Sequence, residues 1–477
     1  MKKEYDDSYD KEIQELVKYY ENACQTSGTP YLDVEDFIDL INYYMSNGVD
    51  EKAIDVCNRA LVVYPNDADI SLKLAQIYAF RGDVDNCEDI LGPIESLHTD
   101  NYELYLTKML VELQRRNITK AKIHAKKALK LGKRSNQDEY LDLIISIGEA
   151  FEDNMYIDEA FEIYKSAFND FKNENELLLR MGDNRCHSGK IEECFDYYKA
   201  ALDIDPFQTN VWFNIGLTYN LMQEYERAIE AYDYAIAIDP SLSEAIFNKG
   251  NALCALEHYT EAIECYTEHL TANPQNPIAK CYIGDCYLKM EEIDTAEKYF
   301  LEANQIQPTA EAYVGLASIS IYRGQDQEAL EYSQMALEIA PEMESAVFVN
   351  AQAMSLTGDF EAAIRTYKQL LNNKKDDIKT HLLYIFALLI AEQFDNAFEA
   401  ANNALEMFPE HAQLQYIISA LLYKRGEIEK SFELFETAYS QAPEFDNVYF
   451  EIVPSNKKLA EIKEIRKRLK PKGRRKK

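Results

Sequence analysis

Apolar residues recur three and four positions apart along most of the chain, in short runs separated by polar turns. This spacing places the apolar side chains on one face of a helix and predicts amphipathic α-helices. In the central part of the chain, two such runs fit between successive prolines, as between Pro206 and Pro240. One helix pair cannot bury its own apolar face, whereas stacked pairs can. The pattern therefore predicts an all-α chain of stacked helix pairs.

The same residue types return every 34 positions. Steps of 34 from Gly216 reach Gly148, Gly182, Gly250 and Gly284. Equal steps from Tyr232 reach Tyr164, Tyr198, Tyr266 and Phe300. Small residues let the backbones of crossing helices approach closely, and the aromatic residue is expected to fill the groove between units. We interpret Gly216, Ala228 and Pro240 as packing and turn positions.

The period and its pattern, with Trp212, Gly216, Ala228, Tyr232 and Pro240 in one copy, resemble the tetratricopeptide repeat family over about nine tenths of the chain. The resemblance implies a right-handed α-solenoid superhelix of about twelve helix-turn-helix units. Chains built only of such repeats are commonly long, bacterial and cytosolic. The units are predicted to start near residues 34, 68, 102, 141, 175, 209, 243, 277, 310, 344, 378 and 412.

The predicted organisation has five parts. Residues 1–33 hold an N-terminal capping helix, 34–136 three more divergent units, 137–140 an insertion at which the array can bend, 141–445 nine further units, and 446–477 a capping helix and a basic tail. Capping helices are expected because the end faces of a solenoid would otherwise expose core. Within the second unit, Pro93 is expected to kink or shorten a helix.

Charge divides the chain into an acidic body and two basic segments. The formal net charge is −33, yet residues 115–134 hold nine Lys or Arg and no acid. Residues 456–477 hold twelve Lys or Arg and two Glu. Polybasic runs bind phosphate backbones, but they also occur as solvated caps or fold onto an acidic surface. The candidates for a basic patch are Lys122, Lys126, Lys130, Arg466, Arg468, Arg474 and Arg475.

Motifs of catalysis are not found in the sequence: it has no phosphate-binding loop, dinucleotide fingerprint, H-E-x-x-H or G-x-S-x-G. Cys265 and His269 lie four apart on one helix and could share a face for a metal, but we interpret them as packing positions. We therefore expect no enzyme activity, no cofactor and no metal.

The nine cysteines form no C-x-x-C pair, the longest apolar run is too short to span a membrane, and the N-terminus has no apolar leader. These features predict a cytoplasmic protein.

The resemblance implies that the first helices of successive units line a concave groove that holds an extended peptide. Amide side chains there can bond both N–H and C=O groups of a peptide backbone, although Asn is also an ordinary surface residue. The lysines that would clamp an acidic tail are missing from these positions, so a basic or apolar ligand is expected. The alternative function is a nucleic-acid- or ribosome-associated factor that uses the basic segments. The groove candidates are Asn210, Phe213, Asn214, Asn220, Phe247, Asn248, Asn251, Tyr282 and Asp285.

Overall fold

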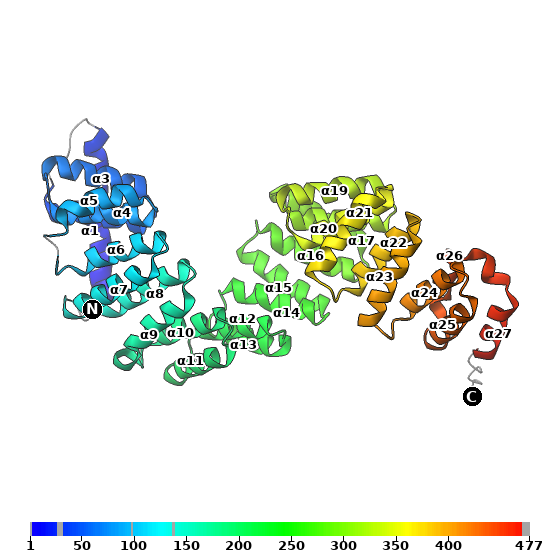
Figure 1. The fold of residues 1–477 in the computed structure, drawn as a ribbon. Coiled ribbons are helices and arrows are strands. Elements are labelled where there is room, and N and C mark those ends of the chain that lie inside the picture. The colour runs from blue at the N-terminus through cyan, green and yellow to red at the C-terminus, as the bar shows by residue number, and fades with distance from the viewer. Residues whose placement is uncertain (1, 26–31, 97–98, 136–138, 470–477) are drawn as a thin grey trace. The chain divides into compact units, whose positions relative to one another are not determined.

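The computed structural model describes residues 2–25, 32–96, 99–135 and 139–469 (Figure 1). Every regular element in these residues is helical: there are twenty-seven α-helices, two short 3-10 helices and no strand. The chain forms two compact units, residues 1–223 and 224–477. The prediction of an all-α helical repeat fold is confirmed.

The N-terminal unit begins with α1 (Lys2–Gln25) and continues with alternating first and second helices. The first helices are α2 (Val34–Ser46), α4 (Ala68–Phe80), α6 (Tyr102–Gln114), α8 (Tyr140–Asp153), α10 (Asn175–His187) and α12 (Thr209–Leu221). The second helices are α3 (Asp50–Val63), α5 (Val84–Ile94), α7 (Ile118–Ser135), α9 (Ile157–Phe171) and α11 (Ile191–Ile204).

The C-terminal unit has the same alternation. Its first helices are α14 (Ser243–Ala255), α16 (Pro277–Lys289), α18 (Ala310–Tyr322), α20 (Glu344–Thr357), α22 (Ile378–Ile390) and α24 (Ala412–Lys424). Its second helices are α13 (Tyr225–Ile238), α15 (Tyr259–Ala272), α17 (Ile293–Ile306), α19 (Asp326–Ile339), α21 (Phe360–Asn373), α23 (Phe394–Met407) and α25 (Ile428–Gln441). First helices start within one residue of the predicted unit starts, while the grouping into five parts stays a prediction.

Glycine and aromatic residues hold the two helices of a pair together. A Cβ atom added to Gly250 of α14 would lie 2.7 Å from Cε1 of Tyr266 on α15, closer than atoms can approach without movement. Gly148 of α8 has the same relation to Tyr164 of α9, with a distance of 2.1 Å. Both tyrosine side chains are buried. The periodic glycines are therefore packing positions, because each leaves room for one aromatic ring.

The N-terminal helix α1 covers the start of the array. Its side chains Ile13, Val17 and Tyr20 are buried, and Val17 and Tyr20 belong to one core cluster with Phe37 and Leu40 of α2. This burial gives the first repeat an apolar partner, as a capping helix should.

Two irregularities follow from local sequence. The helix α5, with Pro93 inside it, has 11 residues, whereas α3 has 14, so the predicted shortening is confirmed. Further along, α7 has 18 residues and takes up part of the inserted sequence as an extra helical turn. The bend predicted for residues 137–140 falls largely outside the described residues.

The C-terminal cap differs from the single capping helix predicted within residues 446–477. The structure has two α-helices, α26 (Asp446–Ile452) and α27 (Ala460–Leu469), separated by a 3-10 helix over Pro454–Lys458. Pro454 lacks the N–H that would continue α26, and it drives Val453 out of the helical region, to φ −130° and ψ 71°. Ile462 and Ile465 of α27 are nevertheless buried, so the segment still covers apolar surface.

Candidate functional site

The groove candidates of the N-terminal unit lie on α12. Asn210 is exposed, and Phe213, Asn214 and Asn220 are partly buried. Asn214 Nδ2 donates a hydrogen bond of 2.8 Å to Asp183 Oδ1 on α10. This amide therefore joins two consecutive first helices and has a structural role that sequence reasoning missed.

Asp183 is the acceptor at the centre of this arrangement. Besides Asn214, the hydroxyl of Tyr198 on α11 donates to the same Oδ1 at 2.5 Å. Burial raises the pKa of the Asp183 carboxyl, and the two hydrogen bonds partly oppose that rise. A partly buried carboxylate is thus held by donors from its own pair and from the next.

The groove candidates of the C-terminal unit come together around Phe247 of α14. The Phe247 ring lies 5.5 Å from the ring of Tyr282 on α16, in a stacked arrangement. It also lies 5.5 Å from Tyr266 and 5.0 Å from His269, both on α15. Three consecutive helices therefore contribute to one aromatic cluster, and two of its members were predicted as groove residues.

Asn248 and Asn251 follow Phe247 along α14. Asn248 Nδ2 donates to the Glu244 carbonyl at 2.9 Å, and Asn251 Nδ2 is 3.4 Å from Asn248 Oδ1. Asn251 Oδ1 accepts a hydrogen bond of 2.9 Å from the Tyr266 hydroxyl. Asn251 is therefore fixed in place, whereas the Asn248 oxygen has a single long contact and can accept from a ligand.

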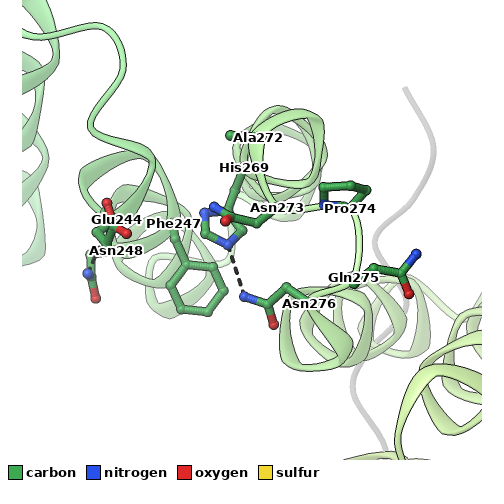
Figure 2. A pocket seen from close by; sticks show the side chains of 9 residues that line it. All are labelled: Glu244, Phe247, Asn248, His269, Ala272, Asn273, Pro274, Gln275 and Asn276. Carbon is green, nitrogen blue, oxygen red and sulfur yellow. Dashed lines mark hydrogen bonds between the residues drawn. The ribbon is translucent and has the colours of Figure 1, made fainter. Parts of the chain in front are cut away.

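A pocket of about 590 Å³ opens beside this cluster. Figure 2 shows its walls, with the His269 ring between Phe247 and Asn276. Two groove candidates, Phe247 and Asn248, line it. Its remaining lining residues come from the start of α14, the end of α15 and the turn into α16: Glu244, His269, Ala272, Asn273, Pro274, Gln275 and Asn276.

Both ring nitrogens of His269 are occupied. Nε2 is 3.0 Å from Asn276 Nδ2, and Nδ1 is 2.9 Å from the Ser243 carbonyl. The amide nitrogen can only donate, so Nε2 accepts and Nδ1 carries the proton that it donates to Ser243. His269 is therefore a wall residue of the pocket, and its nitrogens do not face Cys265 as a metal pair would require.

Asp285 lies one turn after Tyr282 on α16 and is partly buried. Burial raises the pKa of its carboxyl to about 7; Glu311 adds to the rise, and Lys289 opposes it. Within the described chain, no donor lies within hydrogen-bonding distance of the Asp285 carboxyl. In this respect it differs from Asp183 and Asn251, although all three occupy the ninth position of a first helix.

The candidates for the basic patch are largely engaged in ion pairs within the chain. Lys122 lies 3.5 Å from Glu159. Arg466 bonds to Asp446 and lies over the Phe450 ring, and Arg468 is 2.5 Å from Glu436.

The remaining members of the basic patch fall into two groups. Lys126 and Lys130 are exposed, and no acidic partner is found for them among the described residues. Arg474 and Arg475 lie outside the described residues. In the ranges that the structure covers, no helix is long and apolar enough to cross a bilayer.

The helix pairs define the class first: this is an all-α repeat solenoid of the kind that typically serves as a non-catalytic scaffold for other proteins. The family follows from the sequence of the repeats. Residues 209–242 match a tetratricopeptide repeat family model, and residues 247–311 and 387–444 match a second one. These segments are tetratricopeptide repeats, and proteins with such repeats generally bind protein partners.

Individual relatives are distant and partial. Human protein O-mannosyl-transferase TMTC1 is 22% identical over 174 residues, which is 35% of this chain and 19% of that protein. The bovine BBSome complex member BBS4 is 27% identical over 139 residues, 27% of this chain and 26% of that protein. The chain thus spans about a quarter or less of these curated relatives. Among solved structures, a chain of the APC/C hetero-tetramer Cut9-Hcn1 has 14% identity and a TM-score of 0.45, covering 88% of this chain and 97% of its own length.

Proposed function

We propose that this protein is a non-enzymatic scaffold or adaptor whose first helices bind an extended segment of a partner protein. The observation that carries the proposal is the pocket beside Phe247. It combines one aromatic wall with amide side chains of α14 and of the turn between α15 and α16, Asn248 and Gln275 among them. Its volume of about 590 Å³ is within the range of ligand sites in proteins.

The chemistry of the pocket supports an extended peptide. Amide groups donate to backbone carbonyls and accept from backbone N–H groups, so they bind a peptide with little demand on its sequence. Phe247 supplies an apolar contact for one side chain. Glu244 is the charged residue of the lining, which favours a basic or apolar segment over an acidic one. The proposed location is the cytoplasm, where free thiols such as those of the nine cysteines persist.

A display library of random 12-residue peptides, selected on the full chain, tests the proposal. Selected peptides are then measured by fluorescence anisotropy against the double variant Asn248→Ala/Gln275→Ala. Each lost hydrogen bond costs about 1 kcal/mol, so we expect affinity to fall by about 10-fold or more.

The matched control is Asn396→Ala, which removes an exposed amide from the second helix α23. Its affinity should stay within about 2-fold of the wild-type value, because a surface substitution away from the site has little effect. Selected peptides that bind all three proteins equally would show that the pocket is not the site.

A further inference from the structure

Equivalent positions on three first helices carry a side chain that accepts hydrogen bonds. At the ninth position of its helix, Asp183 accepts from the Tyr198 hydroxyl and from Asn214. Asn251 accepts from the Tyr266 hydroxyl. In both cases the tyrosine comes from the second helix of the same pair. The acceptor at this position therefore receives a hydrogen bond from the second helix of the same pair. Asp183 receives another from the next first helix.

Asp285 occupies the same position without either donor. The second helix of its pair has Phe300 where the others have tyrosine, so the hydroxyl is missing. The sixth position of the next first helix, where α12 has Asn214, is Gly315. The Phe300 ring fills the space beside Gly315, because a Cβ added to this glycine would lie 2.3 Å from Phe300 Cζ. Phe300 in place of tyrosine and Gly315 in place of asparagine thus leave the Asp285 carboxyl without the two hydrogen bonds that Asp183 has.

The surroundings of Asp285 favour a cation. Glu311 of α18 lies near enough to raise the pKa of Asp285, and Lys289, one turn further along α16, is the basic group that acts on it. Lys289 is exposed and forms no ion pair with Asp285 within 4.0 Å. Tyr282 presents an aromatic ring one turn earlier on the helix. A partly buried carboxyl without a donor is unfavourable, and a cationic ligand that donates to it removes that penalty.

We propose that Asp285, together with Glu311 and Tyr282, binds a lysine or arginine side chain of the partner segment. The inference rests on the proposed function, because it assumes that a segment lies on the first helices. The site adjoins the pocket of Figure 2, since the Tyr282 ring stacks on Phe247, which lines that pocket. An ammonium or guanidinium group would donate to Asp285, and the face of Tyr282 would add a cation–π contact.

Four synthetic peptide libraries test this proposal on the full chain. Each contains 12-residue peptides with uncharged residues at random positions and one central position fixed as Lys, Arg, Glu or Met. Binding is measured by fluorescence anisotropy at low salt. We expect the Lys and Arg libraries to bind about 10-fold more tightly than the Met library, as a charge-assisted hydrogen bond allows, and the Glu library to bind least.

The variant Asp285→Asn keeps the shape of the side chain and removes the charge. It should abolish the preference for Lys and Arg, so that these libraries bind no more tightly than the Met library. Glu311→Gln should reduce the preference by a smaller factor. Glu338→Gln, an exposed position on the second helix α19, is the matched control for net charge and should preserve the preference.

The outcomes separate the two proposals. If no library binds the wild-type protein, the proposed function fails. If the Met library binds as tightly as the Lys and Arg libraries, or if Asp285→Asn keeps their preference, the cation site is wrong while the groove proposal stands. Far-UV circular dichroism of each variant verifies its fold; should Asp285→Asn misfold, Glu311→Gln and Glu338→Gln still decide the matter.

Discussion

A Cβ atom added to Gly182 of α10 would lie 2.4 Å from Cε1 of Tyr198 on α11. The tyrosine ring therefore occupies the space that any other residue at position 182 would need. The same ring carries the hydroxyl that bonds to Asp183 at 2.5 Å. Tyr198 therefore both packs against Gly182 and holds the Asp183 carboxylate in place.

We expect Gly182→Ala to destabilise the N-terminal unit by about 1–3 kcal/mol, because the added methyl group overpacks a filled core. The protein has a single tryptophan, Trp212 on α12, whose indole bonds to the Pro206 carbonyl, so its fluorescence reports on this unit during a urea titration. The matched control is Gly92→Ala in α5, where the added Cβ would contact nothing within 4 Å. The control should cost no more than about 1 kcal/mol, because the helix preference of alanine is opposed by the following Pro93; equal losses in both variants would contradict the packing explanation.

The 34-residue spacing predicts the Gly–Tyr contacts because both residues recur at a fixed offset within one pair. It does not predict the bond between Asn214 and Asp183, which joins different pairs and uses residue types that are common on any surface. The pocket is an intermediate case. Phe247 and Asn248 follow from their position in the repeat, whereas His269 and Asn276 become wall residues through a turn whose geometry the periodicity does not specify.

Arg185 of α10 gives a second prediction. Its side chain is 2% exposed, and its guanidinium carbon lies 3.6 Å from the centre of the Phe161 ring. It also donates to Asn184 Oδ1 at 2.5 Å. Lysine carries the charge but lacks the planar group that stacks on the ring, so Arg185→Lys should cost about 1–3 kcal/mol in the Trp212 titration.

Arg180→Lys is the control for this prediction. Arg180 has a side chain that is 37% exposed and pairs with Glu149 at 2.8 Å, an interaction that lysine can retain. Its effect should stay within about 0.5 kcal/mol, as for other exposed ion pairs. A loss for Arg185→Lys no larger than that for Arg180→Lys would contradict a stabilising contribution from stacking on Phe161.

The ion pairs of the C-terminal basic helix lead to a third prediction. Arg466 bonds to Asp446, whose side chain is 19% exposed, and lies 4.6 Å from the centre of the Phe450 ring. Arg466→Ala should therefore speed hydrogen exchange in α26 and α27 by about 5–30-fold, equivalent to about 1–2 kcal/mol. Arg468→Ala, which removes a 59% exposed partner of Glu436, should change exchange by less than about 3-fold.

The same two variants test the nucleic-acid alternative. Since both arginines are engaged within the chain, we expect binding of a duplex RNA probe to be unchanged by either substitution. A loss of RNA affinity in Arg468→Ala, with a shallower dependence on salt, would favour the alternative function. The RNA affinity of the double variant Lys126→Ala/Lys130→Ala is the comparison, because these lysines are exposed and lack an acidic partner in the described part of the chain.

Asp285 makes the stability of the C-terminal unit depend on pH. The pKa of its carboxyl is about 7 in the folded protein and near 3.8 when unfolded. Between these values the folded state holds a proton that the unfolded state has lost, so stability falls as pH rises and levels off above pH 7. Asp285→Asn removes this dependence, and its stabilising effect should grow by about 2 kcal/mol between pH 5.5 and pH 8, because the pKa of about 7 lies inside this interval.

The measurement is the urea transition seen by far-UV circular dichroism after subtraction of the transition reported by Trp212. Glu338→Gln removes an exposed carboxyl, and its effect should be the same at both pH values. A gain for Asp285→Asn that does not change with pH would contradict the raised pKa.

Saturation with a Lys-containing peptide should lower the pKa of Asp285, because a bound ammonium group favours the ionised carboxylate. The pH dependence of the wild-type protein should then shift toward lower pH, which links the titration of this one carboxyl to occupancy of the proposed site.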